Sequence, residues 1–310
     1  MLRPMATWSD WRNAMGNDRI RFIVTPVACI LAASCGGVVE PADRHDAGEP
    51  GRCGALESLA VLPSASICVS RSVAIPLGYS IDATEVTRSQ YEAWLSTGPD
   101  PSVQPQVCKW NSSFVPNPSS KLDPYVCHGN ACEDHPQTFV DWCDAHAFCE
   151  SFGKRLCGAI EGAAVSYDDL TFMAKGQWVG ACTSGGIHNY PYGGSSTAEW
   201  DDGFDPRRCN GYDNWATGCK TGSCMTVPAG SLGDCQSTQT GFGGVYDLSG
   251  NVGEWEDSCD GFTGGQDFCH VRGGSFFSDR DSLRCVAGAY ASERRADAND
   301  VTGFRCCSLQ

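Results

Sequence analysis

Cysteine is the residue type in this sequence with the widest range of possible chemistry, because twenty cysteines occur in 310 residues. Thiols bind metals, carry out redox reactions or form disulfides, and a reducing cytosol would leave this many thiols unpaired. The sequence lacks the CxxC…CxxC, HxxxH and HExxH spacings of zinc sites. We therefore predict disulfides formed in an oxidising compartment, with Cys259–Cys269 and Cys219–Cys224 as natural short loops.

The N-terminal segment predicts export independently of the cysteines. Two arginines precede an apolar run at residues 22–33, which is too short to span a bilayer and is typical of a signal peptide. The small residues before Cys35 resemble a bacterial lipobox, so residues 1–35 are predicted to be a signal peptide cleaved before a lipid-carrying Cys35. Ordinary signal cleavage followed by secretion is the alternative, and Met15 is an alternative start to Met1.

The rest of the chain divides into a tether and one domain. Residues 36–52 are polar and rich in Gly, Pro and Asp, which is typical of a flexible linker. Residues 53–310 contain recurring apolar segments without a second linker, so we predict one domain there. Setting aside Cys29 and Cys35 leaves eighteen cysteines, an even number that can pair completely.

The charge balance excludes one class of partner. A net charge of -15 without a basic stripe argues against nucleic-acid binding, which needs clustered Lys and Arg. Membrane contact is expected only through the N-terminal lipid, at the outer membrane or the cell surface. The partner that we expect is a peptide or glycan ligand.

Short elements must position the cysteines, because 36 glycines and 16 prolines interrupt the chain. Helices are predicted at residues 87–95, with Thr87 as N-cap, and at 141–152, before a C-capping Gly153. Strands are predicted at 73–76 and 268–272. The second helix has a face that we expect to be buried, formed by Trp142, Ala145, Phe148, Cys149 and Phe152.

Several motifs occur in a fixed order, at residues 81–91, 140–156, 190–193, 209–211, 244–255, 271–276 and 302–305. Together they resemble those of the formylglycine-generating enzyme, or sulfatase-modifying factor, family. The resemblance implies the family's α+β, C-type-lectin-like fold, here loop-rich and disulfide-stapled. Within the motifs we expect Trp142, Trp255, Phe276 and Phe304 in the core and positive φ at Gly153, Gly250, Gly273 and Gly274.

Two arginines of these motifs are expected to be structural. Arg272 and Arg305 stand beside glycine or phenylalanine, and we predict buried bidentate contacts with carboxylates. Candidate partners are carboxylates such as Asp141, Asp247 or Glu254.

The resemblance also implies calcium, which prefers hard oxygen ligands. Asn251 and Glu254 match one family site, with Gly250 and Val252 as carbonyl donors. Asn210 and Gly211 match part of a second site, whose downstream ligands are replaced by residues 219–224. A purely structural turn held by Asn251 and Glu254 is the alternative.

The family's aerobic chemistry uses two cysteines five residues apart that bind copper(I). Cys285 falls near the first position, but Tyr290 occupies the second. Because copper(I) needs two soft thiolates, we do not expect a copper cofactor here. Cys306 and Cys307 offer Cys285 a disulfide partner instead.

Two functional hypotheses follow, and whether the protein is an enzyme stays open between them. The first is a non-catalytic or divergent surface module that binds a peptide or another ligand. The second is a formylglycine-generating oxidoreductase that uses Cys285 to convert a substrate cysteine to formylglycine. We favour the first because a fold does not supply chemistry when reacting residues are missing.

Overall fold

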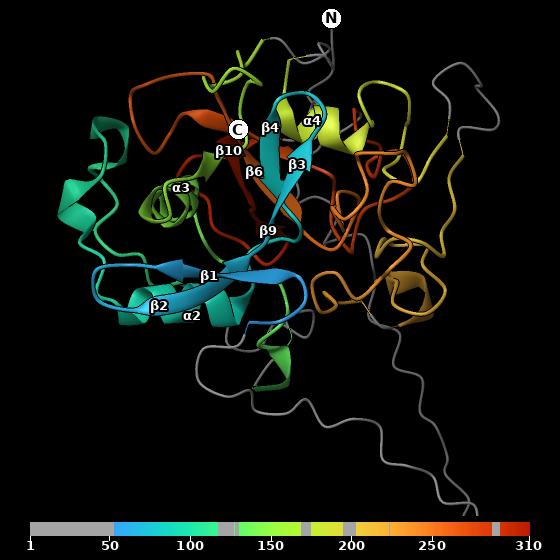
Figure 1. The fold of residues 1–310 in the computed structure, drawn as a ribbon, viewed down its shortest axis with the longest axis horizontal. Helices are drawn as coiled ribbons and strands as arrows, with labels where there is room; N and C mark the ends of the chain where they lie inside the picture. Colours follow the sequence, from blue (N-terminus) through green and yellow to red (C-terminus); the bar gives the residue numbers. More distant parts are fainter. Residues whose placement is uncertain are drawn as a thin grey trace, which may run out of the picture. The chain divides into compact units, whose positions relative to one another are not determined.

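Two four-stranded sheets and one hairpin form the regular β-structure of the described residues (Figure 1). The computed structural model describes residues 53–116, 127, 130–168, 175–194, 203–222, 224–286 and 292–310. The hairpin pairs β1 (Glu57–Val61) with β2 (Ser66–Ser70). The predicted signal peptide, Cys35, the tether and Tyr290 lie outside the described residues.

The first sheet is antiparallel and takes its strands from both ends of the domain. Its strands, in spatial order, are β3 (Ser72–Ile75), β4 (Tyr79–Asp82), β10 (Cys306–Leu309) and β5 (Arg155–Leu156). The last strand of the chain is therefore an inner strand, hydrogen-bonded on both sides. This strand order joins the C-terminus to elements formed more than 140 residues earlier in the sequence.

The second sheet carries the motif strands. Its strands, in spatial order, are β8 (Ser292–Arg294), β7 (Phe268–Arg272), β6 (Gly253–Cys259) and β9 (Thr302–Gly303). β6 and β9 run parallel, whereas the other neighbours are antiparallel. Only Phe304 and Arg305 separate β9 from β10, so these two residues connect the sheets.

The two predicted helices are present, and their caps explain their boundaries. α2 (Arg88–Ser96) begins after Thr87, which forms a reciprocal capping box with Gln90. α3 (Trp142–Ser151) begins after Asp141 in the same way, and Gly153 follows its end at φ 66°. The described residues also contain a shorter helix, α4 (Gln177–Cys182), and four 3-10 helices: Pro101–Val103, Gln106–Cys108, Asn130–Cys132 and Cys219–Thr221.

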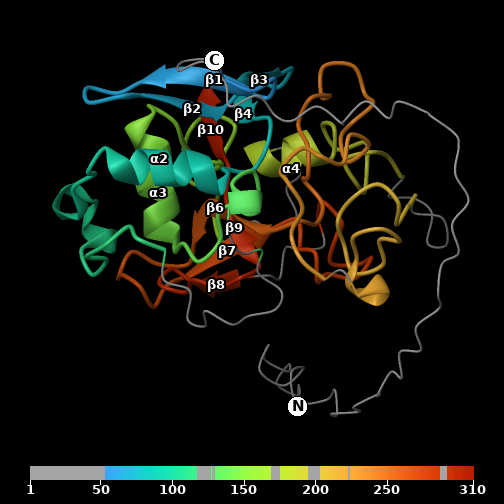
Figure 2. The same cartoon turned by 90° about the horizontal axis from the view of Figure 1, so that it is seen from below.

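The first sheet separates two hydrophobic clusters, with α2 and α3 on one side and α4 on the other (Figures 1 and 2). Consecutive strand residues point to opposite faces, so Cys306 joins the cluster around α2 and α3, and Cys307 joins the cluster around α4. The four motif aromatics expected in the core are buried, as is most of the predicted face of α3. None of the described helices is long and apolar enough to cross a bilayer.

Nine disulfides pair every described cysteine, as the even count predicted. Cys259–Cys269 and Cys219–Cys224 are confirmed. The expected partner of Cys285 is wrong, because its sulfur is bonded to Cys182 of α4. Cys306 and Cys307 point away from each other and bond instead to other cysteines, in the pairs Cys149–Cys306 and Cys157–Cys307.

The paired cross-links of β10 give a stability prediction. Cys149–Cys306 and Cys157–Cys307 close nearly the same loop, of 157 and 150 residues. When one pair is removed by Ser substitution, the other still closes nearly the same loop, so the unfolded chain gains little freedom. When both are removed, the loop between β10 and the α3–β5 region is closed only as far as the Cys182–Cys285 disulfide. We expect the double removal to lower the unfolding free energy by roughly 4 kcal/mol more than either single removal. Guanidinium unfolding without reductant measures this, and equal, additive losses would contradict it.

Candidate functional site

A buried ion pair lies where the two sheets meet. Arg305 donates from Nε to Glu254 Oε2 and from Nη2 to Oε1, each at 2.7 Å. Both side chains are almost wholly buried. Burial opposes the charge on Arg305, but the Glu254 carboxylate together with the nearby acids Glu85 and Asp247 raises the pKa of the guanidinium. The predicted bidentate contact of Arg305 is therefore confirmed, with Glu254 as its partner.

The same guanidinium also fixes the neighbouring backbone. Arg305 Nη1 donates to the carbonyl of Asp82 in β4 at 3.0 Å, and Nη2 donates to the Tyr246 carbonyl at 2.7 Å. On the other side, Trp178 Nε1 donates to Glu254 Oε2 at 2.9 Å, which brings α4 to the pair. One ion pair thus connects β4, β6, α4 and the turn that precedes β6.

Arg272 differs from its prediction. It donates from Nε to Glu256 Oε2 at 2.7 Å, a single contact with a carboxylate that was not among the expected partners. Glu254 and Glu256 stand on either side of Trp255 in β6, so their side chains leave the strand on the same face. Each of them pairs with a different arginine there. Arg305 takes Glu254, which leaves Glu256 for Arg272.

A second pair of carboxyl groups lies close to Arg305 and has no cation of its own among the described residues. Burial and then the charge of Asp247 raise the pKa of Glu85 well above its usual range. Burial raises the pKa of Asp247 to about 6, although Gly230 N donates to Asp247 Oδ2 at 2.6 Å. The two acids therefore hold a proton at pH values where exposed carboxyls have lost theirs.

The motif turn at 247–251 brings the predicted calcium residues together. Asn251 is at φ 62°, its N–H donates to the Asn210 carbonyl at 2.8 Å, and its Oδ1 accepts from Asn210 Nδ2 at 3.1 Å. Gly250, at φ 78°, lies so close that an added Cβ would be 2.2 Å from the Asn210 carbonyl oxygen. The motifs at 209–211 and 247–251 are thus one packed unit.

The side chains of this unit do not fit the implied calcium site. Both oxygens of Glu254 face Arg305, and Asn251 Oδ1 also accepts from Val227 N at 2.9 Å. The Asn210 Oδ1 atom is buried without a hydrogen-bond partner, which leaves one free side-chain oxygen among the residues expected to ligate through their side chains. Gly211 packs against Leu283, and calcium at Gly250, Val252 and Gly211 carbonyls stays a prediction.

The predicted catalytic residue is enclosed in the core. Cys285 is 1% exposed and Cys182 is 0% exposed, and their sulfurs are bonded at 2.02 Å. Cys182 Sγ lies 3.4 Å from the Leu248 carbonyl oxygen, so this disulfide packs against the motif turn. Cys285 N donates to the Asn189 carbonyl at 2.8 Å, which fixes the backbone on its other side. In this arrangement Cys285 offers no thiolate to a metal or a substrate.

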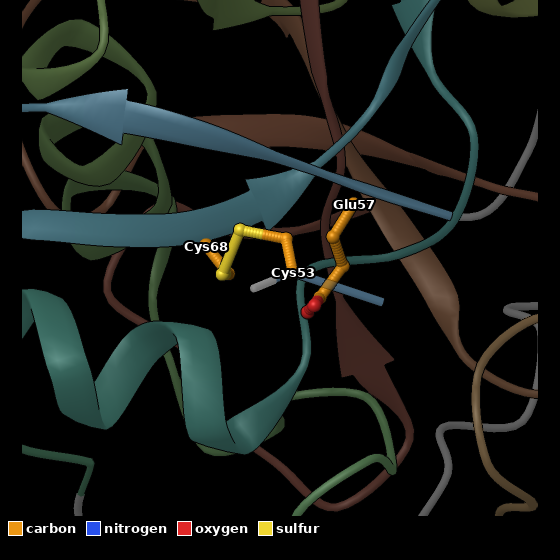
Figure 3. A group of neighbouring side chains, drawn as sticks. All are labelled: Cys53, Glu57 and Cys68. Atoms are coloured by element: carbon orange, nitrogen blue, oxygen red, sulfur yellow. A yellow bond between two sulfur atoms is a disulfide. The ribbon is translucent and has the colours of Figure 1, made fainter. Parts of the chain in front are cut away.

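A third group of metal-ligand residue types lies beside β1. Cys53, Glu57 and Cys68 are neighbours, and Figure 3 shows the yellow bond that joins the two sulfurs. Glu57 accepts hydrogen bonds from Gly54 N and Gln90 Nε2, each at 2.8 Å. The disulfide and the carboxylate therefore tie β1 to β2 and α2, and they leave no thiolate for a metal.

Comparison with known proteins decides the family. A family model described as "Sulfatase-modifying factor enzyme 1-like domain" matches residues 66–309, most of the chain. The chain belongs to the sulfatase-modifying factor family. This confirms the α+β, C-type-lectin-like fold class that the motifs implied.

Solved structures similar to this family member include three proteins of low identity. The structure of PvdO from Pseudomonas aeruginosa has a TM-score of 0.47 and 16% identity, and the match covers 82% of this chain and 91% of that chain. CarF has a TM-score of 0.46 and 18% identity, with 81% and 100% covered. Treponema denticola variable protein 1 has a TM-score of 0.44 and 15% identity, and the match covers 82% of this chain and 99% of that chain. No curated protein matches the chain significantly.

Sequence reasoning missed Cys182 and the Glu85–Asp247 pair of this sulfatase-modifying factor domain. Cys182 lies in α4, a helix that was not predicted from the sequence. Eighteen cysteines also allow too many pairings for their spacing to select one. Glu85 and Asp247 both belong to motifs that had been recognised. Their separation of more than 160 residues gave no sign that they meet.

Neutralising Glu254 tests the central ion pair. Glu254→Gln leaves the buried Arg305 guanidinium without its hydrogen-bonded counter-charge, so we expect a loss of about 3 to 5 kcal/mol in unfolding free energy. Asp213→Asn is the matched control, because the Asp213–Lys220 pair is exposed and is worth less than about 1 kcal/mol. Urea unfolding of both variants measures the difference, and similar losses would contradict a special role for Glu254.

Asp247 predicts a pH dependence of stability. Its folded pKa of about 6 exceeds the model-compound value of 3.8, so its contribution to stability is complete below about pH 4 and is lost as the pH rises to about 6. Asp247→Asn should remove this step, and Asn tolerates the φ of 60° found there. Thermal unfolding of wild type and variant from pH 4 to pH 8 gives the difference. A difference independent of pH would contradict the assignment.

Proposed function

We propose that this protein is an exported, non-catalytic ligand-binding member of the sulfatase-modifying factor family. The observation that carries the proposal is the buried disulfide between Cys182 and Cys285. It removes the one cysteine that the family resemblance placed in a catalytic position.

The proposal follows from what the family chemistry requires. Copper(I) binding needs two soft thiolates, and a substrate cysteine must reach the ion. Among the described residues every cysteine is in a disulfide, and both sulfurs of this pair are enclosed. The fold, by contrast, is held by Arg305 and Glu254 and does not depend on a reactive thiol. A binding role therefore requires only the folded domain, which is retained, and not the reactive thiols, which are absent among the described residues.

The alternative is a formylglycine-generating oxidoreductase. In that case Cys182 and Cys285 would exist as thiols in the working protein, and the helix residue Cys182 would stand in for the missing second cysteine at Tyr290. The backbone around both sulfurs would also have to open, because neither is accessible to a peptide. The experiment below distinguishes this hypothesis from the proposed one.

The proposal includes the location of the protein. Nine disulfides are consistent with an extracellular protein. We place the protein at the cell envelope as a lipoprotein attached through Cys35, with residues 36–52 as the tether, or else as a secreted protein. Its ligand is a peptide or a glycan, and calcium is the only metal that we retain as a candidate cofactor.

Mapping the thiols and assaying the released thiol together test the function. We expect non-reducing alkylation and peptide mapping of the exported protein to recover Cys285 only as a Cys182 cross-link. Wild type and Cys182→Ser, which frees Cys285, are then incubated with copper, oxygen and a cysteine-containing peptide. We expect no formylglycine from either protein, as detected by an aldehyde-reactive probe.

The control is Cys285→Ser, which removes the same disulfide but leaves no thiol at the family position. Aldehyde formed by wild type, or by Cys182→Ser and not by Cys285→Ser, would overturn the proposal. Thermal unfolding shows whether the two variant proteins remain folded, since each loses the same cross-link.

A further inference from the structure

The tip of the β6–β7 hairpin carries the most exposed large apolar side chain of the described residues. Phe262, in the loop at residues 260–267, is 86% exposed. A single exposed apolar residue is common on protein surfaces. Phe262 differs in how firmly its loop is held and in the cavity that borders the loop.

A buried ion pair beneath the loop fixes its backbone. Arg295 Nη1 donates to Asp267 Oδ2 at 2.7 Å, and both side chains are buried. The same guanidinium donates to the carbonyls of Gly261 and Gly264, each at 3.1 Å. Asp267 Oδ2 also accepts from Thr263 N at 2.8 Å and from Gly264 N at 3.1 Å. The residues on both sides of the exposed phenylalanine are therefore hydrogen-bonded to this pair.

The base of the hairpin is closed as well. The disulfide Cys259–Cys269 joins its two strands. Asp260 N donates to the Phe268 carbonyl, and Phe268 N donates to Asp260 Oδ1, each at 2.8 Å. A side chain on a loop that is already ordered costs little backbone entropy when it enters a contact. Phe262 is thus a preformed contact group.

A cavity of about 490 Å³ borders this loop, a volume in the range of small-ligand sites that can accommodate a phenyl group. A Cβ added to Gly265 of the loop would lie 3.0 Å from the Trp110 indole and 2.9 Å from the Ala296 methyl group. Trp110 and Ala296 also line the cavity, so the loop and the cavity share a wall. The apolar lining of the cavity consists of Trp110, Val115, Pro116, Phe139, Ala296 and Ala298.

The acidic residues that line the cavity need no further partner. Asp141 and Asp144 each accept a hydrogen bond from the backbone N–H of the other, and Asn111 Nδ2 donates to Asp144 at 2.7 Å. An aromatic ring carries partial positive charge at its edge, so a phenyl group can approach such oxygen atoms. The cavity therefore suits an aromatic side chain.

The relative position of Phe262 and the cavity favours a second copy of this chain as the partner. A projecting group and a complementary cavity that lie side by side on one face are self-complementary, because a two-fold axis brings each to the other. The same two features at separate places on a molecule would instead join copies head to tail into filaments. Phe262 does not fill the cavity of its own copy, since it is 86% exposed.

We propose that this face forms a homodimer in which Phe262 of each copy enters the cavity of the other copy, between Trp110 and Val115. The net charge of -15 makes two copies repel each other, so the association depends on apolar contacts. The dimer is independent of the proposed function, because the interface uses none of the residues around Cys182 and Cys285.

Sedimentation velocity of the oxidised full chain tests the proposal, with Cys35→Ala in every protein to prevent association through lipid. We expect a monomer–dimer equilibrium that strengthens as salt rises, because salt screens the repulsion between acidic copies. Phe262→Ser should raise the dissociation constant about a hundredfold or more, since a two-fold dimer loses two insertions and each buried phenylalanine is worth about tenfold.

Val115→Arg should weaken the dimer similarly, because it places a long charged side chain at an exposed wall of the cavity. Val115 is 66% exposed, so neither this change nor Phe262→Ser removes a core contact, and thermal unfolding checks that both variants fold. Trp215→Ser removes a 69% exposed aromatic side chain elsewhere and should leave the dissociation constant unchanged.

Mixing the two variants distinguishes reciprocal insertion from general adhesion. A mixed dimer keeps one insertion, in which Phe262 of the Val115→Arg copy enters the intact cavity of the Phe262→Ser copy. The mixed pair should therefore bind about tenfold more tightly than either variant binds itself. A monomer at the highest soluble concentration, an unchanged dissociation constant in Phe262→Ser, or no gain on mixing would overturn the proposal. Phe262-dependent binding of a monomeric chain to phosphatidylcholine vesicles would assign the face to a bilayer and would also overturn it.

Discussion

The contact between Arg305 and Glu254 is the constraint on which the rest of this domain depends. A buried guanidinium needs acceptors for its donors, and those of Arg305 come from β4, β6 and the turn before β6. Satisfying Arg305 therefore fixes the relative position of two sheets that share few backbone hydrogen bonds. The paired cysteines next to it, Cys306 and Cys307, then secure each face of the same strand to a different hydrophobic cluster.

Acidic residues outnumber basic ones in the chain, 37 to 22, and the buried acidic residues are arranged in two different ways. Glu254, Glu256 and Asp267 each have an arginine. Glu85 with Asp247, and Asp141 with Asp144, form no ion pair of this kind among the described residues, and burial is the main cause of their raised pKa values. The first pair is enclosed in the motif core, whereas the second forms the capping box at the start of α3.

The parts of the fold that could be predicted from the sequence are those governed by local rules. Thr87 and Asp141 marked helix starts because capping depends on residues three apart, and the spacing of Trp142, Ala145 and Phe148 showed the buried face of α3. The motifs also predicted that Arg305 would meet a buried carboxylate. The partner of Cys285 could not be predicted, because 103 residues separate it from Cys182 and the pairing follows from tertiary packing. For the same reason the sequence did not indicate the cavity beside Trp110, because its lining residues come from three separate segments.

The position of β10 has a consequence for how the chain reaches its folded state. A polypeptide is delivered from its N-terminus, and here the inner strand of the first sheet is nearly the last part to arrive. Until then Glu254 has no arginine, Cys149 and Cys157 have no partners, and β4 and β5 have no strand between them. Closure of the first sheet therefore depends on contacts between segments that are far apart in sequence, which is the kind of topology that folds slowly. The region between β4 and β5 can close into a cross-linked core only after β10 has been made.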